Sequence, residues 1–161
     1  MSQLSAKVQD YRGRKRDLLA FDGAKASGEA QLVQAMVLPD ESGAMIAGIE
    51  KLAQRFLLEL LTEFGSMPYR PGRGCMFMLE GRSGLWRTPG DVVSSFSSSV
   101  LTITDNLVSD EEPGDPDDER FKSATVESVS LVQDLVVLRI VLTSLAGTSR
   151  TVLFPLRVSN T

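Results

Sequence analysis

The sequence predicts an α+β domain in which a long amphipathic helix and a second helix pack on a small antiparallel β-meander. Three observations predict this class. Apolar residues recur at helical spacing between residues 45 and 61, a proline-led helix start occurs at 88–91, and three β-branched segments follow residue 120. The chain has 161 residues, of which 42% are hydrophobic and 24% charged, and this suits one domain with a real core. We therefore expect a single domain over residues 39–161 and an extended arm over residues 1–38.

The N-terminal arm carries little pattern. Its basic residues gather between Arg12 and Arg16, and an apolar segment, Leu32–Leu38, has the composition of a strand. The arm begins with a polar, basic stretch that lacks the apolar region of a signal peptide, which predicts an intracellular site of synthesis. We expect the arm to be ordered partly by contact with partners.

The first helix has the clearest pattern. Pro39-Asp40-Glu41-Ser42 provides a start, since Asp40 or Ser42 can accept a hydrogen bond from a first-turn N–H. Gly65 is placed to end the helix, because glycine tolerates the left-handed conformation beyond the last turn. Leu58 lies outside the apolar stripe and is a candidate for intermolecular packing. The apolar stripe consists of Met45, Ile46, Ile49, Leu52, Ala53, Phe56, Leu57, Leu60 and Leu61.

The next segment, Cys75–Leu79, is either a short strand or a helical turn, because periodicity over so few residues does not separate the two. A second helix begins near Thr88, with Pro89 at its first position and Asp91 completing a capping box. The β-branched residues favour a competing strand around Val100–Thr104. The helical spacing is kept by Val93, Phe96, Val100 and Leu107.

An acidic loop is predicted over residues 109–119, with seven acids between Asp110 and Glu119 and no basic residue among them. The ordinary explanation is that these charges are exposed to solvent. The more specific explanation is that they contact basic surfaces of neighbouring subunits. The meander follows. Its predicted strands are Ala124–Leu131, Leu135–Thr143 and Arg150–Val158, with turns at Gln133-Asp134 and Ala146-Gly147-Thr148.

Catalytic chemistry has few candidates in this chain. Histidine is absent and cysteine occurs once, at Cys75, which excludes a histidine-activated nucleophile, a disulfide framework and a zinc site built from nitrogen and sulfur. A carboxylate pair for glycoside hydrolysis remains among Glu59, Glu63 and Glu80, although the first two are foremost a like-charge pair on one helix. The spacing around Gly72-Arg73-Gly74 is not that of a phosphate loop. We expect no enzyme, cofactor or metal.

The most distinctive segment is the corner, residues 65–74, which holds two prolines and three glycines. Tyrosine and arginine are enriched in interface hot spots, and the corner carries Tyr69, Arg70 and Arg73. We expect all three to be presented to partners, so that alanine at Arg70 and Arg73 spares the isolated fold. The predicted protein-interface residues are Leu58, Gly65, Pro68, Tyr69, Arg70, Pro71, Arg73 and Gly74.

At these residues the sequence resembles the small baseplate wedge subunits of contractile phage tails, also called sheath initiators or tail-lysozyme-like proteins. The matching runs are Ile49–Phe56, Leu60-Leu61-Thr62 and Gly65–Gly74. The resemblance extends over about residues 43–158, but only the helix and corner are specific to the family. The family often carries a glutamate-proline-arginine triplet farther on. This chain departs from that pattern, with Glu112-Pro113-Gly114 and a separate Glu119-Arg120.

The resemblance implies a structural role without enzymatic activity. Members of the family bundle with the larger baseplate wedge subunits, lie near the hub and tail tube proteins, and offer the tail sheath protein its first sheet. It further implies about six copies in a closed ring. The expected location is the virion tail baseplate after synthesis in the host cytoplasm, without nucleic-acid or membrane partners. Bacterial injection machines contain relatives, so the resemblance does not by itself indicate a phage.

A meander has two edge strands, and a partner strand can pair with either of them. We expect the last strand or the N-terminal arm to exchange with a neighbouring sheath subunit, and truncation after Gly147 to leave the helices folded. The predicted sheet-augmentation residues are Arg150, Val152, Phe154 and Leu156. Two alternatives are a peptidoglycan-cleaving tail enzyme and a protein whose basic arm binds nucleic acid.

Overall fold

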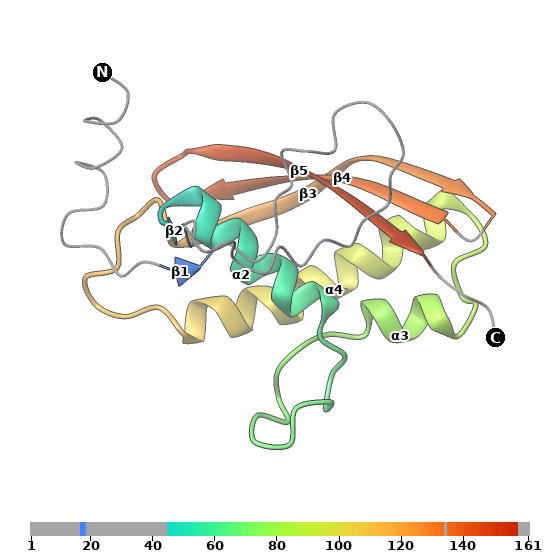
Figure 1. Cartoon of the computed structure of the whole chain (residues 1–161), viewed down its shortest axis with the longest axis horizontal. Coiled ribbons are helices and arrows are strands. Elements are labelled where there is room, and N and C mark those ends of the chain that lie inside the picture. Colours follow the sequence, from blue (N-terminus) through green and yellow to red (C-terminus); the bar gives the residue numbers. More distant parts are fainter. Residues whose placement is uncertain (1–16, 19–44, 134, 158–161) are drawn as a thin grey trace.

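The structure is a computed structural model that describes residues 17–18, 45–133 and 135–157. Within these ranges the predicted α+β class is confirmed, since the helices lie against one face of a three-stranded antiparallel meander (Figure 1). Most of the predicted arm, with the basic cluster Arg12–Arg16 and the segment Leu32–Leu38, lies outside the described residues. The elements are β1 (Asp17–Leu18), β2 (Met45–Ile46), α2 (Ile49–Leu61), α3 (Phe77–Arg82), α4 (Pro89–Ser109), β3 (Phe121–Val132), β4 (Leu135–Ser144) and β5 (Ser149–Arg157).

The first helix is shorter than predicted. Met45 and Ile46 were expected on its apolar stripe, but they form β2, which pairs antiparallel with β1. Gly48 then adopts φ 63°, a left-handed conformation open to glycine, and α2 begins at Ile49. The predicted start at residues 40–42 lies outside the described residues. From Leu52 to Leu60 the apolar stripe is buried as the spacing predicted, and Leu61 is half-buried.

The end of α2 also differs from the prediction. The helix ends at Leu61 rather than near Gly65, because Thr62 turns into an extended conformation with φ −82° and ψ 122°. This turn brings Glu63 beside Cys75 in an isolated parallel bridge. The segment for which the sequence allowed either a strand or a helical turn contains both, a bridge at Cys75 and then α3.

Helix α4 confirms the second predicted helix and its cap, and the competing strand at residues 100–104 is wrong. The side chain of Thr88 accepts a hydrogen bond from the N–H of Asp91 at 3.2 Å. The carboxylate of Asp91 accepts from the N–H of Thr88 at 2.8 Å and of Arg87 at 3.0 Å. The backbone bond from Thr88 is the main reason why the pKa of Asp91 lies below its ordinary value.

The sheet order is β3-β4-β5, with both neighbouring pairs antiparallel, which confirms the predicted meander. Two register shifts, after Phe121 and after Val126, interrupt the pairing of β3 with β4. The second shift keeps the apolar side chains on either side of it on the same inner face. These inner-facing β3 residues are Ala124, Val126, Val129 and Leu131.

Helices and sheet share one core. Phe56 of α2 lies between Phe96 of α4 and Phe121 of β3, with ring centroids 6.1 and 5.8 Å away. Three residues of β5 are also buried in this core: Val152, Phe154 and Leu156. Truncation after Gly147 removes all three. The sequence-based expectation was that the helices survive this truncation, and we replace it with the expectation that the domain unfolds.

Candidate protein-docking site

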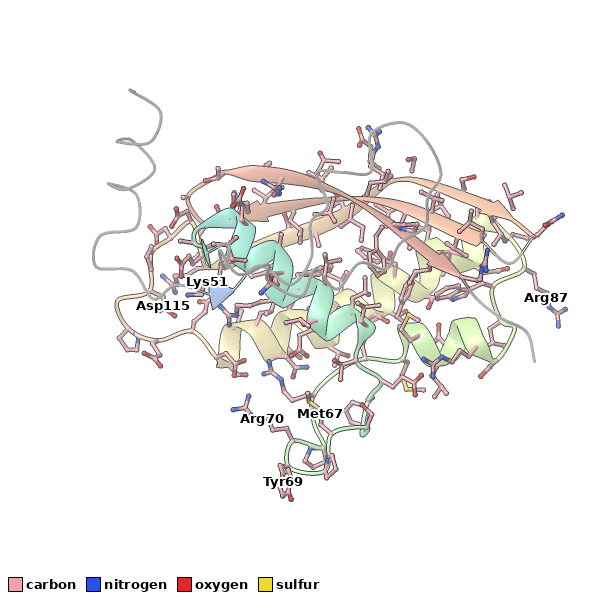
Figure 2. The ribbon with its side chains drawn as sticks, viewed as in Figure 1. Lys51, Met67, Tyr69, Arg70, Arg87 and Asp115 are labelled. Carbon is pink, nitrogen blue, oxygen red and sulfur yellow. The ribbon has the colours of Figure 1, made fainter. Side chains whose placement is uncertain are left out.

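The corner extends away from the two layers, and its tip is exposed (Figure 1). Figure 2 shows Met67, Tyr69 and Arg70 on this loop, and the side chain of Tyr69 is 98% exposed. Two turn hydrogen bonds order the tip, from the N–H of Arg70 to the carbonyl of Met67 at 3.1 Å and from the N–H of Arg73 to that of Arg70 at 3.0 Å. The corner is therefore a folded loop with an aromatic and a cationic side chain at its end.

The base of the corner is closed by backbone pairing. The N–H of Cys75 donates to the carbonyl of Thr62 at 2.9 Å, and the N–H of Phe64 donates to the carbonyl of Cys75 at 3.0 Å. Gly74 has φ +84°, and a Cβ at this position would overlap the carbonyl oxygen of Thr62. Only glycine fits there, because both the left-handed backbone and the close approach exclude a side chain.

Arg73 lies against the body of the protein, which differs from the expectation that it is presented together with Arg70. Its guanidinium nitrogen Nη2 is 2.5 Å from Glu59 Oε1 and 2.7 Å from Asp110 Oδ2, and Nη1 donates to the carbonyl of Asn106 at 3.2 Å. Burial lowers the pKa of Arg73, but its hydrogen bonds and charge interactions with Asp110 and Glu59 outweigh burial and raise it. Arg73 thus ties the corner to α2 and to the end of α4.

The buried carboxylate of Glu59 is the acceptor around which this base is built. It receives the N–H of Gly74 at 3.1 Å and the side-chain amide of Asn106 at 2.9 Å in addition to the arginine. Its neighbour Glu63 forms an ion pair with Arg82 at 2.6 Å. Glu63 lies beyond the end of α2, so it does not share one helix with Glu59 as the sequence predicted. Both carboxylates, which the sequence offered for glycoside hydrolysis, are paired with an arginine, and Glu59 supports the corner.

Exposed apolar residues surround the base of the corner. Leu58 is 44% exposed, in the outward position that its place outside the stripe indicated. Phe64 and Met76 flank the bridge between Glu63 and Cys75 and are 55% and 46% exposed. Phe64 and Met76 were not among the predicted interface residues. Both are apolar residues beside a turn or a helix start, where the spacing of apolar residues does not indicate that a side chain is buried. That position was the signal in the sequence that could have identified them.

The only cysteine, Cys75, is buried at this base, and its thiol lies 3.7 and 3.6 Å from the carbonyls of Glu59 and Leu60. Burial raises the pKa of this thiol. Because the thiolate is the reactive form, the thiol is protected from modification and serves as a small core residue.

The acidic segment, residues 110–119, makes several internal contacts, so it is not simply a solvated loop. Glu119 is 3% exposed, and its carboxylate accepts from the N–H of Gly48 at 3.0 Å and from Nζ of Lys51 at 2.7 Å. Glu111 accepts from the N–H of Phe121 at 3.1 Å. These contacts hold the start of α2 and the start of β3 against the end of α4.

The predicted augmentation residues of β5 lie with their side chains inward or paired. Val152, Phe154 and Leu156 are core residues, and Arg150 pairs with Glu50 at 2.9 Å. What a partner strand can use at this edge is therefore the backbone, not these side chains.

The backbone groups of β5 alternate between β4 and the free edge. The N–H of Ser144 donates to the carbonyl of Thr148 at 2.9 Å. With the register of the two strands, this bond shows that the even-numbered residues of β5 bond to β4. Thr151 and Leu153 therefore direct their backbone groups outward, as does Pro155, which pairs with Val137 and has no N–H to offer. The β5 edge consequently lacks one donor, at Pro155, in the C-terminal half of the strand.

No family model matches this chain, and no curated protein matches it either. None of the helices in the described ranges is long and apolar enough to cross a membrane. Within the same ranges, no three histidine, cysteine, aspartate or glutamate side chains gather in a way that could hold a metal ion.

Proposed function

We propose that this protein is a structural subunit of a contractile tail baseplate, where it joins wedge and hub proteins near the tail tube and initiates sheath assembly by sheet augmentation. The observation that carries the proposal is the corner, with Tyr69 and Arg70 exposed on a loop that Arg73 and Gly74 hold in place. A loop that is ordered before binding loses little conformational entropy when a partner contacts it.

The chemistry of the corner fits a protein partner. Tyrosine supplies a large contact area with few rotatable bonds, and arginine supplies a large contact area with five hydrogen-bond donors. The exposed side chains of Phe64 and Met76 extend an apolar surface next to the loop. A surface with an aromatic tip, a cation and an apolar flank supports docking onto another polypeptide.

The meander supports the second half of the proposal. A three-stranded sheet has two edges, and β3 and β5 each leave one row of backbone groups without a neighbouring strand among the described residues. A partner strand can pair with such a row through backbone hydrogen bonds.

The test of the docking role is incorporation into tail particles. The double variant Tyr69→Ala, Arg70→Ala removes both tip side chains, and we expect incorporation to fall by about thirtyfold, the effect of losing a hot spot of about 2 kcal/mol. Arg87→Ala is the matched control, because Arg87 is an exposed arginine far from the corner (Figure 2). Normal incorporation of the double variant would reject the docking role of the corner.

Electron microscopy of intact tails tests the proposal as a whole. We expect density for this chain in a ring around the tube, next to the hub. Its absence from tails would reject the proposed function. Purified protein separates the rival classes, since an enzyme would clear cell-wall substrate and a nucleic-acid binder would retain DNA in a salt-dependent manner.

A further inference from the structure

The geometry points to the free edge of β3, not that of β5, as the place where a partner strand adds to the sheet. This inference rests on the proposed function, because it names the edge and the kind of segment that the sheet accepts. It departs from the sequence-based expectation, which placed augmentation on the last strand.

The outward backbone groups of β3 follow from the same alternation. On β4 the even-numbered residues bond to β5, so the odd-numbered ones, such as Val137 and Val141, bond to β3. The β3 residues that lie opposite the even-numbered β4 residues do not bond to β4, and they direct their N–H and C=O groups to the free edge. They are Ala124, Val126, Val129 and Leu131, none of them proline.

The apolar layer of the sheet is incomplete along this edge. The inner side chains of β4, such as Leu138 and Ile140, are fully buried, whereas the four inner side chains of β3 are only half-buried. Their outer sides have no neighbouring strand among the described residues. A strand with apolar side chains at alternate positions would cover them and would make the core layer continuous.

Helix α4 provides a support beneath this edge, because it packs against β3. Residues 93, 97, 100 and 104 share one flank of α4. Beyond the end of the helix, Glu111 accepts a hydrogen bond from the N–H of Phe121, the first residue of β3. On the α4 flank Val93 is 39% exposed and Val100 is half-buried. An added strand would therefore find backbone partners on one side and apolar side chains below it.

Charge defines the partner further. The inner side chains along the edge, Ala124, Val126, Val129 and Leu131, and residues 93, 97, 100 and 104 of α4 carry no charge, so the inner side of the added strand is uncharged. Glu127, in the middle of β3, forms an ion pair with Arg139 at 3.7 Å. The acidic segment lies at the start of β3. Its residue Asp115 and the basic residue Arg87 lie at opposite ends of the molecule (Figure 2). The partner is thus an extended segment of another polypeptide, about eight residues long at 3.3 Å per residue, with a basic residue facing the acidic segment.

A second copy of this chain fits the edge less well. Two β3 edges that pair with one another would each bring the register shifts after Phe121 and Val126, and such bulges oppose edge-to-edge pairing between copies. A segment from a different chain can carry an irregularity that matches the second shift.

Matched proline variants of the full chain test the assignment. Ala124→Pro removes an outward donor from β3, and Thr151→Pro removes one from β5, while both leave the ladder bonds to β4 in place. The probe is the tail sheath protein, co-expressed with each variant, and the readout is sheath polymer initiated per mole of this protein. We expect wild type and Thr151→Pro to act alike and Ala124→Pro to act about tenfold less efficiently.

A second blocking variant keeps the test decisive if the proline impairs folding. Ala124→Lys places a charge on the inner side of the edge, where an added strand would have to bury it, and thermal melting confirms that each variant folds. Equal activity of a folded Ala124 variant, or selective loss in Thr151→Pro, would overturn the inference while the proposed function stands. Inactive wild type would overturn both. Concentration-dependent dimers of wild type that Ala124→Lys abolishes would assign the edge to a second copy and would also overturn it.

Discussion

Removing the guanidinium of Arg73 is the sharpest test of how the corner is held. Arg73 contacts the buried carboxylate of Glu59 and the partly exposed carboxylate of Asp110, with side chains 10% and 36% exposed. Removing one partner of a buried ion pair costs roughly 3–5 kcal/mol, because the other charge stays buried. Glu59 keeps the donors of Gly74 and Asn106, which reduces this cost, while the exposed pair adds less than about 1 kcal/mol.

We therefore expect Arg73→Ala to lower the free energy of unfolding by about 3 kcal/mol. At about 2–4 °C per kcal/mol for a chain of this size, the melting temperature falls by about 6–12 °C. Thermal and urea denaturation measure the change. Arg70→Ala is the matched control, because Arg70 is exposed at the tip, and we expect its effect to stay within about 0.5 kcal/mol.

Amide hydrogen exchange adds a local measurement to the same prediction. If Arg73 ties the corner to the body, its removal speeds exchange in residues 66–75 more than in the sheet. A free energy of unfolding for Arg73→Ala within about 0.5 kcal/mol of wild type would refute the reasoning. Equal destabilisation by Arg70→Ala would refute it as well, since the two arginines would then have similar surroundings.

The remaining predictions concern a glycine, a thiol and a helix cap. Gly74→Ala lowers the free energy of unfolding by more than about 2 kcal/mol, whereas Gly72→Ala changes it little because Gly72 has open space around it. Urea denaturation measures both changes, and equal values would contradict this prediction. Cys75 reacts with thiol reagents only after unfolding, so rapid labelling of native protein would be the opposite result. The pKa of Asp91 is depressed, so its contribution is complete above pH of about 4 and is lost as the pH falls through the folded value. An NMR titration of Asp91 measures this pKa directly, and Thr88→Ala should raise it.

Local signals in the sequence predicted several elements well. The capping box at Thr88 and Asp91 placed the start of α4, because the bonds of a cap join residues only three apart. Alternation and turn residues placed the three strands of the meander within a few residues. The start of α2 was misplaced because Met45 and Ile46 fit both a helical stripe and a strand, and pairing with a distant segment, β1, decided between them.

The candidate site shows the same division. Proline and glycine identified the corner, and the side chains of Tyr69 and Arg70 are exposed at its tip. The inward position of Arg73 could not be predicted, because Glu59 and Asp110 are distant in sequence and meet it only after α2 and α4 pack together. The outward backbone groups of β3 were equally hidden, since their direction follows from the hydrogen-bond pattern of the whole sheet.

The sequence by itself determined the α+β class, the meander and the existence of a rigid turn after the first long helix, since these depend on periodicity and on the backbone limits of proline and glycine. Only the tertiary structure decided which arginine supports the corner, which carboxylates pair with an arginine and which backbone groups of β3 and β5 face away from β4. Those properties depend on contacts between segments far apart in the chain, and local sequence carries no record of such contacts.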